Sequence, residues 1–363
     1  MVKAAVLYEV GSPLVIEDVE LDDPQAGEVL VKIGAAGICR SDRHFMHGDA
    51  PIALPVVLGH EGAGTVEKVG PGVNSVRPGQ QVILSFVPSC GRCKSCITGN
   101  SHLCDNHAAT GPNMYDGTTR LHKGDQRIHH MGKTACFAEY AVVPETGCVA
   151  IDVNIGMDKA ALIGCCVPTG VGAVTSSAKV TPGSTVAVIG CGGVGLNAVQ
   201  GARLGGALRI IAIDAVEDKL TLAREFGATD VIDASSGDVE KRVKDMTGGG
   251  VDYSFEAIGK KETAELSFEL LRAGGTATII GMIPQGTKIE LDGSAFLRER
   301  RIQGSSMGSN HFRVDMPRYI DFYLQGRLKL DELVTKRLKL EDINEAFVYM
   351  KEGSVARSVM MFD

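Results

Sequence analysis

The sequence predicts an α/β protein that combines a barrel-like β domain with a doubly wound parallel sheet. Two observations support this prediction, and a length of 363 residues allows two domains. From residue 184 onward, strand-like and helix-like segments alternate, which is typical of parallel strands connected by helices. In the first half, short strand-like segments are separated by Gly and Pro, as in an all-β barrel: 14–21, 28–37, 62–70, 77–85 and 137–144.

The alternating half predicts six strands, the number in a complete doubly wound sheet. We expect these strands at 185–190, 209–214, 230–233, 251–257, 276–282 and 301–306. Helices are expected at 194–204 and 216–226. Segment 158–180 also has a helical pattern, which Pro168 and Gly170 must bend or interrupt. Helices at 317–324 and 340–351 and a strand at 357–362 should return to the first domain, because so small an appendage could hardly bury its own core.

Four cysteines lie within fifteen residues, in the pattern C-x2-C-x2-C-x7-C: Cys90, Cys93, Cys96 and Cys104. This spacing brings four thiolates within reach of one tetrahedral cation, and Zn2+ favours four sulfur ligands. Such a site has no open coordination position, so it should stabilise a loop and perform no chemistry. Disulfides are the alternative, which the expected reducing compartment disfavours.

A glycine-rich loop follows the strand expected at 185–190 and opens the next helix. Gly190, Gly192 and Gly195 form G-x-G-x-x-G, and in this strand–turn–helix context the motif predicts binding of a dinucleotide pyrophosphate. Asp214 ends the next strand, 19 residues after Gly195. Its carboxylate would accept hydrogen bonds from the ribose hydroxyls and repel a 2′-phosphate, which favours NAD over NADP. Asp214 could instead cap the following helix. Lys219 is a weaker candidate for a ribose contact.

A nicotinamide enzyme with a structural zinc invites a search for a second zinc site with three ligands and one open position. Cys39, His60 and Cys165 are candidates because each lies near a glycine in a turn. Zinc with two cysteines, one histidine and a water could ionise a bound alcohol near neutral pH. Taken singly, each residue is equally consistent with a buried core position, and Cys166 is a rival to Cys165.

Several segments together resemble the zinc-containing medium-chain alcohol dehydrogenases. They are GICRSDRH, LGHEGAGTVEKVG, the four-cysteine segment, LIGCCVPTGVGA, GCGGVGL, RIIAID and RSVMMF, in the family's order and spacing. The likeness is greatest to the branch that contains alcohol dehydrogenases and thiol-dependent formaldehyde dehydrogenases. It implies a GroES-like β-barrel catalytic domain at 1–165 and 308–363 and a Rossmann NAD-binding domain at 166–307.

The resemblance also implies roles for individual residues. Cys39, His60 and Cys165 would bind the catalytic zinc. Glu61 would lie behind the metal, or pair with Arg357. Ser41 and His44 would carry the substrate proton, and Asp42 would support a zinc ligand. The cofactor would contact Arg40, Thr169, Gly190, Gly192, Gly193, Val194, Gly195, Asp214, Lys219, Ile280, Met282, Met307 and Arg357. Phe86, Ala50 and Ala109 would line the substrate channel, where the two alanines leave room for aromatic or branched alcohols.

The resulting expectation is an NAD-dependent enzyme with two zinc ions per subunit that interconverts an alcohol and an aldehyde or ketone. One alternative is oxidation of the S-hydroxymethyl adduct of a thiol, which would need an anion-binding group in the channel such as Arg120 or Lys123. Another is a nicotinoprotein with permanently bound NAD. A catalytically silent protein that binds zinc and nucleotide is disfavoured because every expected ligand and the glycine loop are present.

The composition of the chain indicates which binding partners and which cellular compartment to expect. A formal charge of −7 argues against non-specific binding to nucleic acid or an anionic membrane, and so against a nucleic-acid-binding zinc protein. No apolar run approaches the ~20 residues that span a bilayer, and MVKAAVLYEV is too polar for a signal peptide. Ten cysteines without a secretory signal are typical of a reducing cytoplasm. By resemblance we expect a homodimer or homotetramer that pairs through the strand at 301–306.

Overall fold

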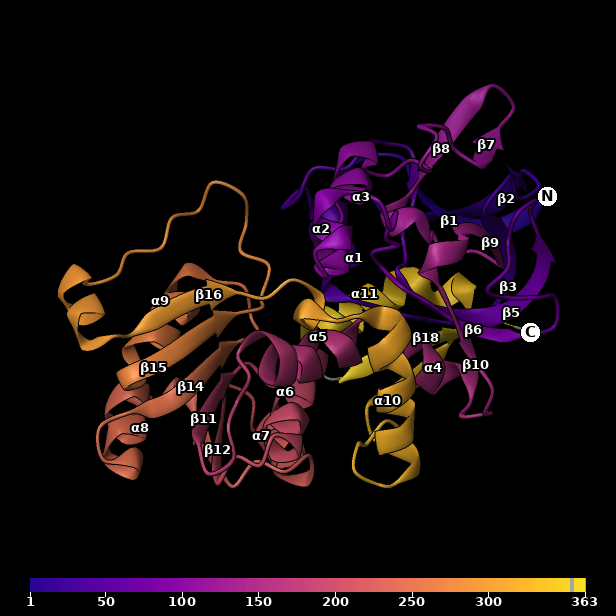
Figure 1. The fold of residues 1–363 in the computed structure, drawn as a ribbon. Coiled ribbons are helices and arrows are strands. Elements are labelled where there is room, and N and C mark those ends of the chain that lie inside the picture. The colour runs from indigo at the N-terminus through magenta and orange to yellow at the C-terminus, as the bar shows by residue number, and fades with distance from the viewer. Residues whose placement is uncertain (353–355, 363) are drawn as a thin grey trace. The chain divides into compact units, whose positions relative to one another are not determined.

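The computed structural model describes residues 1–352 and 356–362 and divides the chain into two compact units (Figure 1). The first unit, here the barrel unit, comprises Met1–Cys165, His311–Tyr323 and Leu330–Asp363. The second, here the sheet unit, comprises Cys166–Asn310 and Leu324–Lys329. The sheet unit is thus built almost entirely from one uninterrupted stretch, whereas the barrel unit draws on both ends of the sequence.

Five strands of the barrel unit close into a barrel. In order around it they are β1 (Val2–Leu7), β2 (Val15–Leu21), β7 (Leu121–Lys123), β8 (Gln126–His130) and β4 (Val56–Val57). The antiparallel pair β7–β8 is closed by a two-residue turn and the antiparallel pair β1–β2 by a longer loop, and β4 joins β1 to β8. Four consecutive side chains of β1, Ala4–Leu7, are fully buried, so this strand lies inside the apolar core on both faces.

A seven-stranded sheet continues the barrel unit. Its order is β10 (Cys148–Ile151), β6 (Gln81–Leu84), β5 (Glu61–Val69), β3 (Glu28–Gly37), β18 (Arg357–Met361) and β17 (Val334–Leu338), and β9 (Tyr140–Pro144) also pairs with β3. The C-terminal strand β18 therefore lies inside this sheet, beside a strand from the first forty residues.

The helices of the barrel unit are mostly short. They are α1 (Arg40–His47), α2 (Lys94–Ile97), α3 (Asp105–Thr110), α4 (Met157–Ile163), α10 (Phe312–Leu324) and α11 (Ile343–Glu352). Single 3-10 turns are η1 (Ser101–Leu103), η2 (Met131–Lys133), η3 (Glu145–Gly147) and η8 (Leu340–Asp342). Several of these helices directly follow a strand or a cysteine of interest, and so they fix the loops that carry candidate ligands.

The sheet unit contains six parallel strands in the order β13 (Asp230–Asp233), β12 (Arg209–Asp214), β11 (Thr185–Ile189), β14 (Val251–Glu256), β15 (Leu271–Ile279) and β16 (Arg301–Gly304). The strand order reverses between β11 and β14. In open α/β sheets ligands bind outside the carboxyl ends of the strands at such a reversal.

Helices lie on both faces of this sheet (Figure 1). They are α5 (Cys166–Gly172), α6 (Gly193–Leu204), α7 (Glu217–Glu225), α8 (Val239–Thr247) and α9 (Lys261–Glu269). A π-helical segment, η4 (Ala173–Ser177), continues α5, and η5 (Ala234–Ser236), η6 (Gly293–Arg298) and η7 (Met307–Ser309) are 3-10 turns. The apolar interior between sheet and helices contains Ile211, Ile213 and Phe268 among others.

The predicted barrel and doubly wound sheet are both present, with differences at particular elements. Helix α10 begins at Phe312, not at 317, because the Asp315 carboxylate accepts the His311 amide (2.7 Å) and so caps the start of the helix. Strand β15 begins five residues earlier than expected, since pairing with β14 outweighs the weak strand preference of Gly274 and Gly275. Helices α8 and α9 and the short barrel strands were not predicted.

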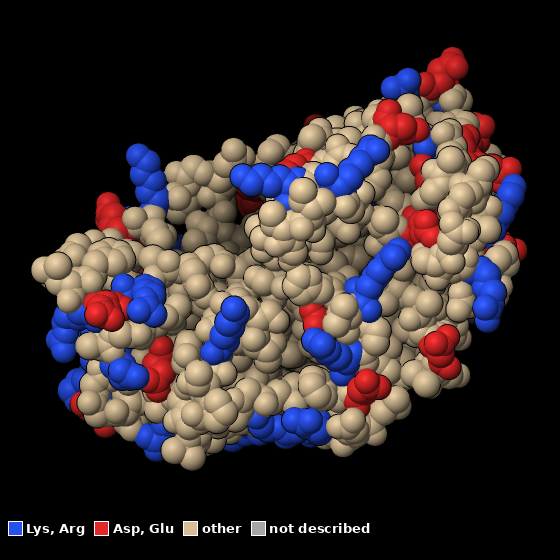
Figure 2. Space-filling model, in the orientation of Figure 1, with Lys and Arg blue, Asp and Glu red and all other residues tan. Residues whose placement is uncertain are grey.

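Surface charge and hydropathy add two observations. On the face drawn in Figure 2, basic and acidic side chains are interspersed. Within the described residues no single helix is long and apolar enough to cross a membrane, although α4 and the helix Cys166–Ser177 pass that test together as a bent pair. Most side chains of this pair are buried, as in core helices.

Candidate active site and metal centres

The first candidate centre lies in the barrel unit. Cys39, His60, Glu61 and Cys165 are all buried, and each offers one ligand atom that lies within 4.8 Å of the other three. Cys39 directly precedes α1, His60 and Glu61 stand at the start of β5, and Cys165 follows α4. The fold therefore brings together the three residues that the sequence suggested as ligands, and it adds Glu61 at the same point.

Asp42 connects this centre to the surrounding backbone. Its buried carboxylate accepts the Cys39 amide through Oδ2 (2.9 Å) and the Gly59 amide through Oδ1 (3.1 Å). Oδ1 also lies 3.1 Å from His60 Nδ1. A proton on Nδ1 leaves Nε2 as the ligand atom of a neutral imidazole. His60 Nε2 is buried and has no hydrogen-bond partner in the described part of the chain, so its environment fits a metal ligand.

The ionisation of these residues also fits a cation site. A hydrogen bond with Cys165 lowers the pKa of the Cys39 thiol well below its usual range, against the effect of burial and with help from His60. Burial alone would lower the pKa of His60, but Asp42 and Cys39 raise it well above its usual value. Asp42 and Cys39 thus stabilise positive charge on His60 in an apolar setting, and a divalent cation could supply that charge in place of the proton.

Glu61 has a positively charged partner behind the centre. Arg357, the first residue of β18, forms a buried ion pair with its carboxylate. Burial raises the pKa of Glu61 to about 7, although Arg357 lowers it. This pairing corresponds to the alternative considered for Glu61 from the sequence. Contact of Arg357 with the cofactor pyrophosphate stays a prediction.

The proposed proton-carrying residues lie on α1, next to this centre. Ser41 Oγ is 3.8 Å from Cys39 Sγ. His44 Nδ1 is 2.8 Å from Asp49 Oδ2, a partner that the sequence analysis missed because Asp49 lies in the turn after the helix. A proton held between Nδ1 and Asp49 leaves His44 Nε2 as the nitrogen that can exchange protons.

Phe86 forms one wall at the centre. Its ring packs on that of His60, with centroids 4.5 Å apart, and it meets the His107 ring edge-on at 6.4 Å. A Cβ added at Gly132 would lie 2.5 Å from Phe86, so Gly132 lets the chain pass directly against the ring. Sequence reasoning missed His107 and Gly132. Ala50 is half-buried and Ala109 is exposed on α3, and their place in a substrate channel stays a prediction.

The second candidate centre is the four-cysteine lobe, residues 90–104. The sulfur atoms of Cys90, Cys93, Cys96 and Cys104 lie within 4.8 Å of one another. Backbone amides of Cys90 (3.3 Å) and His107 (3.4 Å) donate to Cys104 Sγ, which stabilises a thiolate. Burial and neighbouring thiols raise the pKa of Cys96 to about 12, so four thiolates can coexist here only around a cation. The residues present fit a closed zinc site.

Lys133 is buried beside this lobe without a carboxylate partner among the described residues. Its Nζ donates to the carbonyl oxygens of Gly111 (2.8 Å) and His107 (3.2 Å) and lies 5.3 Å from the Tyr115 ring centroid. Burial lowers the pKa of Lys133 to about 8, and only the charge of Cys104 opposes this shift. A buried lysine ammonium without a carboxylate partner is stabilised by a nearby group of net negative charge, such as a zinc ion with four thiolates.

The glycine loop of the sheet unit lies between β11 and α6. Gly190 has φ +95° and a Cβ added at Gly195 would overlap Gly190 O, so both positions require glycine. Gly192 is the N-cap of α6, and Gly193 and Val194 form its first turn, where free amides favour an anion. Asp214 Oδ2 accepts the Cys191 amide (2.8 Å), which fixes this carboxylate beside the loop. Lys219 lies on α7, half-buried.

The other candidate cofactor residues also lie in the sheet unit, except Arg40 and Arg357. Thr169 Oγ1 is 3.7 Å from Met307 Sδ, so these two residues meet as expected for one pocket. Ile280 and Met282 follow β15, and Met282 is partly exposed. Arg40 is exposed at the start of α1 in the barrel unit. The contacts of these residues with a cofactor stay predictions.

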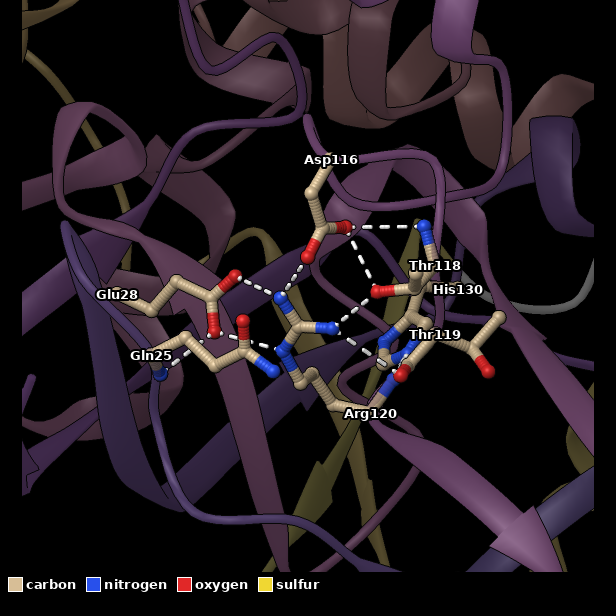
Figure 3. Close-up of polar contacts among 7 residues, drawn as sticks. All are labelled: Gln25, Glu28, Asp116, Thr118, Thr119, Arg120 and His130. Carbon is tan, nitrogen blue, oxygen red and sulfur yellow. Dashed lines mark hydrogen bonds and ion pairs between the residues drawn. The ribbon is translucent and has the colours of Figure 1, made fainter.

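Arg120 and Lys123, considered from the sequence as anion-binding groups, have other partners. Arg120 is buried and forms two hydrogen bonds with Glu28 (2.7 and 2.8 Å) and one with Asp116 (2.7 Å) (Figure 3). Its backbone amide donates to His130 Nε2 (2.9 Å) (Figure 3). Lys123 pairs with Glu17 on the surface. This network fastens the β7–β8 hairpin to β3, so a structural role explains Arg120.

Two family profiles match the chain. The alcohol dehydrogenase GroES-like domain matches residues 25–153, and the zinc-binding dehydrogenase domain matches residues 193–325. The first contains both candidate centres except Cys165, and the second contains α6 and the strands β12 to β16 but begins after Gly190 and Gly192.

Individual proteins are similar over nearly the whole length. The chain is 42% identical to a probable S-(hydroxymethyl)glutathione dehydrogenase of Schizosaccharomyces pombe, over 99% of this chain and 96% of that protein. Benzyl alcohol dehydrogenase from Acinetobacter calcoaceticus superposes with a TM-score of 0.95 at 32% identity, covering 100% and 99% of the two chains. Acetophenone reductase from Geotrichum candidum in complex with NAD gives 0.82 at 28% identity, covering 99% and 97%. The chain therefore belongs to the zinc-containing medium-chain alcohol dehydrogenase family.

Proposed function

We propose that this protein is an NAD-dependent zinc enzyme that interconverts an alcohol and the corresponding aldehyde or ketone. The observation that carries the proposal is the convergence of Cys39, His60 and Cys165 in one buried centre. The barrel unit would act as the catalytic domain and the sheet unit as the coenzyme domain. An alcohol, whether primary or secondary, would lose a hydride to NAD and a proton to the protein.

Zinc held by Cys39, His60 and Cys165 would supply Lewis acidity at the substrate oxygen, and NAD would accept the hydride. Asp42 would keep His60 Nδ1 protonated so that Nε2 stays available as a ligand. Ser41 Oγ would accept the hydroxyl proton of the substrate and release its own hydroxyl proton. His44 would receive it at Nε2, since Asp49 engages Nδ1. The Phe86 ring would exclude water and offer an apolar surface to an aromatic or branched substrate.

For the cofactor, Asp214 supports NAD over NADP. Its carboxylate is fixed by the Cys191 and Val216 amides (2.8 and 3.1 Å) at the carboxyl end of β12. A carboxylate in this position would accept the ribose hydroxyls and repel a 2′-phosphate.

The test is nicotinamide reduction by the zinc-replete protein with aliphatic, branched and benzylic alcohols, comparing NAD with NADP. We expect turnover with NAD that chelation abolishes. Ser41→Ala should lose most of this activity, whereas the matched change Ser95→Ala in the cysteine lobe should not. Preference for NADP would overturn the role of Asp214, and turnover that survives complete removal of zinc would overturn the proposal.

A second candidate is oxidation of the S-hydroxymethyl adduct of glutathione, favoured by the 42% identity to a probable dehydrogenase of that adduct. Against it, Arg120 and Lys123 already form ion pairs and do not supply a free anion-binding group. The same assay with formaldehyde and glutathione decides between the two. A kcat/KM for the adduct well above that for every simple alcohol would favour the second function. Absorbance of NAD in the purified protein would instead identify a nicotinoprotein.

We further propose that the protein forms a homodimer or homotetramer in a reducing compartment such as the cytoplasm. Among the described residues, strand β16 has β15 as its only strand partner, and Phe296 and Leu297 are exposed just before it. An unpaired edge beside apolar side chains suits pairing across a two-fold axis. Six cysteines lie in the two candidate zinc centres, where they must stay reduced to bind the metal, and a reducing compartment favours this. Light scattering of the purified protein tests the oligomeric state.

A further inference from the structure

Glu256 is a buried carboxylate that none of the proposed roles uses. It is the last residue of β14 and is fully buried. It pairs in register with Ile189, the last residue of β11, immediately before the glycine loop. Glu256 therefore lies at the carboxyl edge of the sheet, where the strand order reverses and where ligands of such sheets bind.

One oxygen of this carboxylate organises the turn after β14. Oε1 accepts hydrogen bonds from the amides of Ile258 (2.8 Å) and Gly259 (2.7 Å) and from the hydroxyl of Thr263 (2.8 Å) in the first turn of α9. Hydrogen bonds to a charged acceptor are stronger than hydrogen bonds between neutral groups, and a buried acceptor that loses its donors destabilises the folded state. Three converging donors thus hold the turn in one conformation.

The same residue fixes the loop after β15. Its carbonyl oxygen accepts the amides of Ile280 (2.9 Å) and Gly281 (3.0 Å). A Cβ added at Gly281 would lie 2.6 Å from Glu256 Oε2, so the second carboxylate oxygen packs directly against this loop. Oε2 has no hydrogen-bond partner among the described residues. The loop that carries Ile280 and Met282 is therefore held against Glu256 on two sides.

The turn after β14 in turn supports the glycine loop. A Cβ added at Gly190 would lie 2.5 Å from Ile258 Cγ1, so this isoleucine packs against the backbone of Gly190. The Gly259 backbone lies against that of Met282, where any side chain at Gly259 would collide. Three loops, after β11, β14 and β15, thus meet around one carboxylate.

We infer that Glu256 is the positioning residue of the dinucleotide site, which holds these three loops in their binding geometry. The inference rests on the proposed use of NAD and adds to it a residue that does not touch the reacting atoms. Without this carboxylate the donors at Ile258, Gly259 and Thr263 lose a common acceptor. The loops would then have to be ordered by the cofactor, at the expense of its affinity.

The test compares Glu256→Gln with Glu262→Gln, the same change on the exposed face of α9. NADH affinity is measured by fluorescence well below the unfolding temperature of each protein. Glutamine keeps an oxygen that can accept these hydrogen bonds but lacks the negative charge that strengthens all three. We therefore expect Glu256→Gln to raise the NADH dissociation constant at least about tenfold. KM for NAD should rise while KM for the alcohol and the zinc content stay unchanged. Glu262→Gln should match the wild type.

Hydrogen exchange supplies a second readout. Peptides covering 257–261 and 280–283 should exchange faster in Glu256→Gln without NADH and recover protection when NADH is bound. If Glu256→Gln does not fold, Thr263→Val removes one donor and leaves the carboxylate in place, and we expect NADH affinity to fall about threefold.

The outcomes separate this inference from the proposed function. If the wild type binds NADH but a folded Glu256→Gln or Thr263→Val binds it equally well, the positioning role is wrong and the proposed function stands. An equal rise of KM for NAD and for the alcohol would also overturn the inference, because it indicates a general loss of structure. If the wild type binds neither NADH nor NADPH, the proposed function and the inference are both wrong.

Discussion

Asp42 and His60 form the unit on which the candidate zinc centre depends. One carboxylate, without access to water, accepts two backbone amides and faces His60 Nδ1. It thereby fixes the loop that carries Cys39 and the ring that carries Nε2. Both ligands would lose their support if this single side chain changed, although Asp42 itself offers no atom to the metal.

We therefore predict that Asp42→Asn weakens zinc binding at this centre by about 10- to 100-fold, as loss of such a carboxylate does at other zinc sites. Titration with a chelator and metal analysis should show loss of one zinc per subunit at a lower chelator concentration than in the wild type.

Asp49→Asn is the matched control, because Asp49 contacts His44 and not a candidate ligand. It should keep both zinc ions and lower only the rate of turnover, because it changes the partner of His44. Unchanged zinc affinity in Asp42→Asn would contradict the role given to Asp42.

His130 provides a prediction on acid stability. Burial lowers the pKa of His130 to about 3, with a further contribution from Arg120. In the unfolded chain a histidine titrates near ~6.5. Between these values the unfolded state binds a proton that the folded state does not, so the free energy of unfolding falls as the pH falls, by up to about 1.4 kcal/mol per pH unit. His130→Gln should show a smaller loss of stability between pH 7.5 and 5.

Urea unfolding at both pH values measures this difference. The control is His122→Gln, because a hydrogen bond with Asp22 raises the pKa of that half-buried histidine. The sign is then opposite: the folded state holds the proton more tightly, so any stabilisation is present at low pH and is lost as the pH rises. An identical pH dependence in His130→Gln and the wild type would contradict the prediction.

Among the elements, the cysteine lobe is held by its sulfur atoms and a few polar contacts. Its helices α2 and α3 have four and six residues, too short to be stable without support, and neither contains a buried residue. We predict that Cys96→Ser loses zinc from the lobe, with a marked fall in soluble yield and faster proteolysis within residues 90–110. Cys39→Ala should instead lose the other zinc and all turnover while the fold stays intact.

Metal analysis and limited proteolysis of both variants separate the two centres. A stable, soluble Cys96→Ser protein without activity would overturn the division into a structural and a catalytic metal. Retained activity of Cys39→Ala at saturating zinc would remove Cys39 from the ligands.

The sequence predicts some elements within a residue and misses others for physical reasons. Strand β12 agrees with the prediction because its buried run, residues 210–213, is bounded by Arg209 and Asp214 and is followed by a helix with clear periodicity. Strand β4 has two residues, and no pattern can reveal so short a strand, which exists only because β1 and β8 lie on either side. A strand such as β12 is specified by its own local sequence pattern, whereas a strand such as β4 forms only because neighbouring strands pair with it.

The candidate site divides in the same way. The cysteines, the histidine and the glycine loop are visible in sequence because their residue types and spacing are specific to one chemistry. Asp49, Gly132 and Glu256 are not, since aspartate in a turn, glycine in a loop and glutamate at a strand end are common everywhere. Their importance arises from what the fold places beside them, such as the Phe86 ring against Gly132.

For the whole molecule, the two units should respond to different ligands. Both candidate metal centres belong to the barrel unit and the glycine loop belongs to the sheet unit. NADH at a hundredfold excess over its dissociation constant stabilises the state that binds it by about 2.7 kcal/mol. We predict that NADH slows hydrogen exchange mainly in residues 166–310, whereas removal of zinc speeds exchange mainly in residues 1–165. Mass spectrometry of the exchanged peptides checks both, and zinc-dependent protection centred on 166–310 would contradict the assignment.

The position of β18 has a consequence for how the chain is made. This strand lies between β3 and β17, yet it is synthesised more than three hundred residues after β3. On the ribosome the sheet unit, almost one continuous stretch, can complete its core while the barrel unit still lacks an internal strand. Until residues 357–361 emerge, the last residues of β3, 35–37, lack a partner on one edge and are open to pairing with other chains. The barrel unit, which contains the first residues of the chain, is therefore the last of the two units to complete its sheet.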